Sequence, residues 1–170
     1  TWTIHAHRHA QKRLEIKGDL DLAKQEVIWA AHSVAHTEII RHGKVWEQDV
    51  IYRAMEGDRA LFQTIYVDVL AKPKNQRILA AALAALDKYL DKHYQAHLRP
   101  LLTFLKKQNG VVPLSEIGDH FAFSQIHPGH LESACEWLEH KGLLQKLSAP
   151  FKLTKRSLER VEEPAYSLNA

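Results

Sequence analysis

The sequence predicts a mainly α-helical protein with a β-hairpin near its C-terminus. Apolar residues recur at helical spacing through most of the 170 residues. After Gly142 the period changes, and residues 143–154 and 163–168 are typical of two strands. We therefore expect an N-terminal helical bundle, residues 1–96, followed by a smaller domain with a hairpin, residues 97–170.

The N-terminal domain is expected to contain four or five helices. The four clearest helical patterns cover residues 20–41, 44–56, 59–70 and 76–93. Asp19 or Asp21 can cap the first of them, and Gly57-Asp58 separates the second from the third. Residues 1–17 are interpreted as a solvated basic arm. The Ala-rich face of the last helix would allow close packing, either within one chain or across a homodimer.

The C-terminal domain is expected to contain three helices before its hairpin. Asn109-Gly110 ends the first helix, and a short extended segment follows it. Ser115 is expected to cap the second helix, and Pro128 suits the first turn of the third. The basic residues 155–161 would form the loop of the hairpin.

This order of elements resembles the winged helix-turn-helix superfamily, with the hairpin as the wing. The resemblance is carried by the third-helix pattern LESACEWLEHKGLLQKL, an apolar stripe followed by Lys-Gly and a strand. It covers residues 97–170 only. It implies a module whose third helix enters the major groove of DNA.

The charges of this module are unevenly placed. Its third helix exposes Glu132, Glu136 and Glu139, which would oppose binding to phosphates. The net charge of the chain is only +3, a mild basic bias. The cations expected to contact nucleic acid lie on the hairpin and on the first helix of the module: Lys106, Lys107, Lys146, Lys152, Lys155, Arg156 and Arg160.

The expected function is that of a non-enzymatic nucleic-acid-binding protein, a winged-helix regulator of transcription or an accessory factor that contacts duplex DNA through its basic wing. One alternative is a protein-docking subunit of a larger assembly, with Trp137 as an interface anchor. Trp137 at the edge of the core is the simpler interpretation. Another alternative is the C-terminal part of an enzyme whose catalytic domain lies upstream.

The sequence gives no catalytic set. The single cysteine, Cys135, lies on the apolar stripe of a helix and is interpreted as inert core. His32 and His36 have the spacing of two metal ligands on a helix, but Ser33 stands where a zinc protease pattern has its Glu. A packed His pair is favoured there. His5, His7 and His9 alternate in the N-terminal arm, again without a further ligand nearby, so no metal or cofactor is expected.

Composition indicates an ordinary globular protein. Hydrophobic residues make up 45% of the chain and charged residues 25%. No apolar run approaches the roughly 18–20 residues that cross a membrane. The N-terminus has no signal-peptide pattern, and one cysteine cannot form an internal disulfide. We therefore expect a cytoplasmic protein, although the sequence does not begin with Met.

Overall fold

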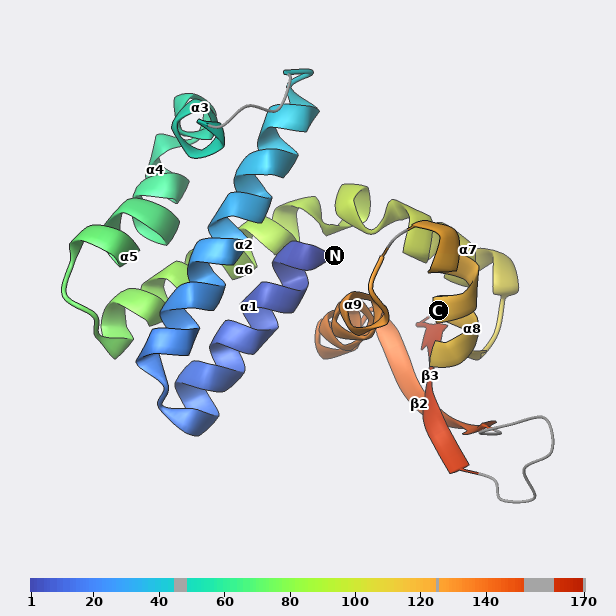
Figure 1. The fold of residues 1–170 in the computed structure, drawn as a ribbon. Coiled ribbons are helices and arrows are strands. Elements are labelled where there is room, and N and C mark those ends of the chain that lie inside the picture. Colours follow the sequence, from blue (N-terminus) through green and yellow to red (C-terminus); the bar gives the residue numbers. More distant parts are fainter. Residues whose placement is uncertain (45–48, 125, 152–160, 170) are drawn as a thin grey trace. The chain divides into compact units, whose positions relative to one another are not determined.

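A computed structural model of the chain describes residues 1–44, 49–124, 126–151 and 161–169. The protein is mainly helical with a small antiparallel sheet, as the periodicity predicts at this coarse level. Its backbone divides into two compact units, Trp2–His93 and Tyr94–Ala170. Each unit is described by itself below (Figure 1).

The first unit opens with two long helices that pack side by side (Figure 1). These are α1, Trp2–Lys12, which continues into the π-helical turn Arg13–Lys17, and α2, Leu20–Arg41. Gly18 adopts the left-handed φ of 62°, which lets the chain reverse between them. Asp19 then caps α2 by accepting a hydrogen bond from the backbone N–H of Leu22 at 3.0 Å.

The interpretation of residues 1–17 as a solvated arm is wrong. These residues form α1 and its π-helical extension, and α1 buries one face with helical spacing. The buried residues of α1 are Thr3, Ile4, Ala6, His7 and Ala10. The polar His residues between them hide this apolar face in the sequence. On a helix His5 and His9 stand together, with ring centroids 4.2 Å apart, and the buried His7 faces elsewhere.

Three short helices, a π-helical turn and one long helix complete the described part of the unit. They are α3, Val50–Gly57; α4, Arg59–Phe62; a π-helical turn, Gln63–Val67; α5, Asp68–Ala71; and α6, Gln76–His97, whose last residues belong to the second unit. Asp58 separates α3 from α4 and caps α4 through the N–H of Leu61 at 3.0 Å. The fully buried Phe62, Ile65, Leu79, Leu86 and Leu90 contribute to the core.

The described part of the second unit holds the end of α6, three further α-helices and a three-stranded sheet. Its elements are α7, Arg99–Gln108; β1, Val112–Pro113; α8, Leu114–Phe121; the 3-10 turn Ala122–Ser124; α9, Pro128–His140; β2, Leu144–Phe151; and β3, Val161–Leu168. The strand order is β1-β3-β2 and both pairings are antiparallel. Leu131, Leu138 and Tyr166 are fully buried and bring α9 and β3 into one core.

Ser115 does not cap α8 with its side chain, as its position in the sequence suggested. The helix begins one residue earlier, at Leu114, after Pro113. Ser115 instead donates from its N–H and its Oγ to the carboxylate of Glu163, at 2.9 and 2.6 Å. Glu163 on β3 therefore satisfies a free N–H in the first turn of α8 and is not simply a solvated acid.

None of the helices within the described ranges has both the length and the apolar character that a membrane crossing requires.

Candidate anion-binding cavity

A cavity of about 490 Å³ opens in the first unit between α2, the start of α4 and α6. This volume is within the range typical of small-molecule sites. Most of its lining residues are polar or charged. α2 contributes Glu38 and Arg41, and α6 contributes Lys88, Tyr89, Lys92 and His93.

Helical spacing explains why these side chains meet. Lys88 and Lys92 are four residues apart on α6, as are Tyr89 and His93, so each pair lies on one face of the helix. The rings of Tyr89 and His93 are 4.7 Å apart.

Glu38 is the centre of the cavity's hydrogen bonds. Its Oε1 accepts from the hydroxyl of Tyr89 at 2.6 Å and from Nη1 of Arg41 at 2.6 Å. Arg41 is three residues along the same helix, whereas Tyr89 reaches across from α6. The side chain of Glu38 is 15% exposed, so the carboxylate is held mostly away from water.

The pKa values of this group follow from these contacts. Burial by itself would raise the pKa of Glu38, but the hydrogen bonds from Tyr89 and Arg41 more than offset it, so the net pKa is below the usual value. Burial, followed by the bond to Glu38, raises the pKa of Tyr89. Burial also lowers the pKa of His93, and Arg41 and Lys92 lower it further. At neutral pH the cavity thus holds an ionised Glu38, a neutral Tyr89 and a neutral His93.

Two of the cations in the cavity have no acidic side chain paired with them among the described residues, although Asp58 also lines the cavity. In the part of the chain that the structure describes, neither Lys88 nor Lys92 has an ion-pair or hydrogen-bond partner. Arg41 is already paired with Glu38. The excess positive charge on the α6 side of the cavity is suited to an anionic group of a ligand.

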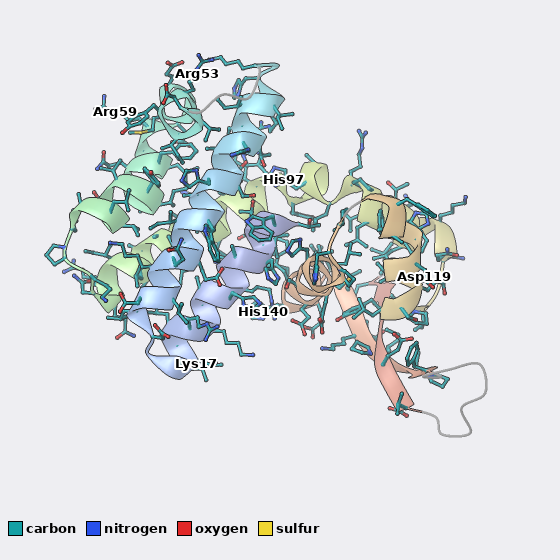
Figure 2. The ribbon with its side chains drawn as sticks, in the orientation of Figure 1. Lys17, Arg53, Arg59, His97, Asp119 and His140 are labelled. Carbon is teal, nitrogen blue, oxygen red and sulfur yellow. The ribbon has the colours of Figure 1, made fainter. Side chains whose placement is uncertain are left out.

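A second cavity, of about 310 Å³, shares Glu38, His42 and Gly57 with the first. Its cationic lining residues are Lys44 and Arg53, of which Lys44 pairs with Glu56 at 3.3 Å. Figure 2 shows Arg53 at the same end of the unit as Arg59 and at the opposite end from Lys17. The two cavities together provide room for a ligand longer than a single phosphate group.

Of the cations that the sequence suggested for nucleic acid, three lie in the described part of the chain, Lys106 and Lys107 on α7 and Lys146 on β2. Lys146 on β2 lies 3.3 Å from the carboxylate of Glu136 on α9, so an acid of the third helix neutralises it. Lys106 lines a different cavity, in the second unit, while Lys107 is exposed beside it on α7. Lys152, Lys155, Arg156 and Arg160 lie outside the described residues.

Trp137, an interface anchor only in the docking alternative, is 2% exposed. Its ring lies 5.8 Å from that of Tyr94, and the ammonium group of Lys141 is 5.2 Å from its centroid. Cys135 on the apolar stripe of α9 is fully buried, and burial raises the pKa of its thiol to about 12. Both side chains therefore belong to the packed interior.

The candidate metal ligands are accounted for by packing contacts. His32 meets the ring of Tyr66 edge-on at 5.5 Å, and burial together with the charge of His32 lowers the pKa of His36. His7 makes a 3.2 Å hydrogen bond to the carbonyl oxygen of Leu83. Across the described ranges, no three His, Cys, Asp or Glu side chains cluster closely enough to hold a metal ion.

The residues of the candidate site were not predicted from the sequence. No motif marks Glu38, Tyr89 or His93 as functional residues. The available signals were the Glu38–Arg41 spacing on one helix and the Lys88–Lys92 spacing on another. Neither spacing reveals that the two helices face each other.

The sequence matches no protein-family model and no curated protein. Its fold is similar to the crystal structure of a nucleotidyltransferase-like protein from Exiguobacterium sibiricum 255-15, with a TM-score of 0.72 and 17% identity. The similarity covers 99% of this chain and 57% of that protein. At this identity the likeness concerns the fold alone.

This finding overturns the winged-helix assignment. The likeness to the nucleotidyltransferase-like protein extends over nearly the whole chain, whereas the winged-helix resemblance rested on residues 97–170. A short order of helices and strands recurs in many proteins and does not by itself identify a family or a function. The expected roles as a DNA-binding regulator of transcription and as a winged-helix docking subunit are therefore wrong.

Proposed function

We propose that this chain binds a phosphorylated small molecule of the nucleotide class in the cavity between α2, α4 and α6. The observation that carries the proposal is the pair of lysines without an acidic partner in the described part of the chain, Lys88 and Lys92, on the wall opposite the Glu38–Arg41 pair. Phosphate groups bind cationic side chains through charge-assisted hydrogen bonds.

Glu38 gives the cavity a second recognition element. Only Oε1 accepts the bonds from Tyr89 and Arg41, which leaves Oε2 as an acceptor for a ligand hydroxyl or amino group. A nucleotide carries such groups on its sugar and base beside its phosphates. The combination of cations and one oriented carboxylate thus favours a nucleotide over a simple inorganic anion.

The similarity to a nucleotidyltransferase-like protein supports the same ligand class, because nucleotidyl transfer uses nucleoside phosphates as substrates. The proposal concerns binding, because the described residues supply cations and a held carboxylate. We also propose that the chain is not itself an enzyme.

Calorimetric titration of the chain with ATP, at low and at moderate salt, tests the proposal. We expect saturable binding that weakens with salt, with adenosine binding at least about tenfold more weakly because it lacks phosphates. Lys88→Gln and Lys92→Gln should each weaken ATP binding by about three- to tenfold.

Lys17→Gln is the matched control, because Lys17 is exposed at the far end of the unit (Figure 2). Equal affinity for ATP and adenosine would contradict the proposal. So would equal effects of Lys17→Gln and Lys88→Gln.

A further inference from the structure

The second unit has a cavity of its own, of about 400 Å³, which the proposed nucleotide site does not involve. Its apolar lining comes from four side chains on three parts of the unit: Tyr94, Leu102, Leu143 and Leu168. Leu168 is 36% exposed and the other three are partly buried, so the cavity is open to solvent.

One wall of this cavity is a single face of α7. Arg99, Leu102, Thr103 and Lys106 all line the cavity, and their spacing of three, one and three residues places them on the same side of the helix. The two cations thus stand two turns apart, with an apolar side chain between them.

The opposite wall is held in place by the end of the hairpin. The N–H of Asn169 donates to the carbonyl of Leu143 at 3.1 Å, and its side-chain amide donates to the carbonyl of Gly142 at 2.6 Å. Gly142 has the left-handed φ of 71°, which brings the chain from α9 directly into β2. These bonds keep Leu143 and Leu168 together although 25 positions separate them in the sequence.

The charge of this cavity is one-sided. Its lining includes Arg99 and Lys106 but no acidic residue. Within the described ranges, neither cation has an ion-pair or hydrogen-bond partner. An apolar surface beside unpaired cations is complementary to a ligand that has an apolar body and one anionic group.

We propose that this cavity binds a small carboxylate with an aliphatic body, of the size of a medium-chain fatty acid. The aliphatic part lies against Leu102, Leu143 and Leu168, and the carboxylate accepts hydrogen bonds from Arg99 or Lys106. The site is separate from the proposed nucleotide cavity, and either proposal can fail without the other.

The test uses the full chain and three ligands with the same eight-carbon body: octanoate, 1-octanol and octylammonium. Calorimetry should give saturable binding of octanoate, binding of 1-octanol about fivefold or more weaker, and no saturable binding of octylammonium. Amide NMR shifts on adding octanoate should concentrate at Leu102, Leu143 and Leu168.

Lys106→Gln and Arg99→Gln should each weaken octanoate binding by about three- to tenfold. Lys107→Gln is the matched control, since Lys107 is the next residue on α7 but does not line the cavity. Circular dichroism verifies that each variant is folded, and these exposed substitutions leave the core unchanged.

Octanoate and octylammonium binding equally well would overturn the proposal, as would equal effects of Lys106→Gln and Lys107→Gln. No saturable binding of octanoate at millimolar concentration would do the same, and would leave the ATP titration unaffected.

Discussion

The hydroxyl of Tyr89 on α6 donates a 2.6 Å hydrogen bond to Oε1 of Glu38 on α2, across 51 positions of sequence. Tyr89 is 7% exposed, so water has little access to the position of its hydroxyl and would compensate poorly for the loss of this bond. A hydrogen bond to a charged, partly buried acceptor stabilises a protein by about 1.5–3 kcal/mol. We expect Tyr89→Phe to lower the free energy of unfolding by about this amount at pH 7, measured by urea denaturation.

The same variant has a defined pH dependence. The folded pKa of Glu38 lies below its ordinary value of 4.5, so the stability it contributes is fully present above pH 4.5 and is lost as pH falls through the folded pKa. Tyr89→Phe removes one cause of that low pKa. The difference between wild type and variant should therefore shrink between pH 5 and pH 3. Tyr52→Phe, at a tyrosine that is 71% exposed, should change little at either pH.

Protonation of His93 should strengthen binding of a nucleotide. Burial, Arg41 and Lys92 hold the pKa of His93 below its ordinary value of 6.5, against the opposing charge of Glu38. The ring is therefore neutral at pH 7.5 and gains a positive charge in the cavity only as the pH falls below 6.5. We expect the ratio of the Kd for ATP of His93→Asn to that of wild type to be near one at pH 7.5.

At pH 5 that ratio should rise to about three- to fivefold. Titration of the phosphates themselves affects both proteins equally and cancels in the ratio. A ratio that stays constant from pH 7.5 to pH 5 would show that His93 does not contribute charge to the site.

Glu163 should stabilise the second unit by accepting two hydrogen bonds from Ser115. Glu163→Ala leaves the N–H at the start of α8 without this acceptor, and we expect a loss of about 1–2 kcal/mol in the free energy of unfolding. Glu116→Ala is a suitable control because Glu116 is exposed in the same turn. Similar losses in the two variants would mean that the contact with Ser115 is not the cause.

Local signals in the sequence predict individual helices well. The cap at Asp19 marks the start of α2 at Leu20–Arg41, the same range that the periodicity gives. The helix at residues 2–12 was not predicted because His5 and His9 stand between buried side chains that, apart from Ile4, are small or polar. Small alanines bury little area, so they give a weak periodic signal even when they are fully buried.

The candidate site could not be predicted in the same way. Glu38 and Tyr89 each lie on a helix that periodicity finds, but their contact depends on how α2 and α6 pack. The family was wrongly predicted for a different reason. The order of elements in residues 97–170 is a local property, and the fold of the whole chain contradicts the function inferred from it.

Trp137→Ala should cost folding stability. The side chain is 2% exposed and contacts Tyr94 and Lys141, so truncation leaves a large cavity. Removing a buried tryptophan typically lowers the free energy of unfolding by about 3–5 kcal/mol. Trp29→Ala is the matched control, because Trp29 is 44% exposed, and it should cost clearly less in the same urea titration. Equal losses would show that the interior does not depend on Trp137.

The thiol of Cys135 should report on opening of the second unit. It is fully buried, and burial raises its pKa to about 12, with Glu136 and Glu132 adding to the effect. The thiolate is the reactive form, so the native protein should resist alkylation by iodoacetamide at pH 8. In urea the thiol regains an ordinary pKa near 9.0 and becomes accessible, and labelling should rise along the unfolding curve.

Because the chain has one cysteine, mass spectrometry of the intact protein counts the reaction directly. Rapid labelling in buffer, well before the fluorescence of the tryptophans changes, would mean that α9 is not packed in solution as the structure describes.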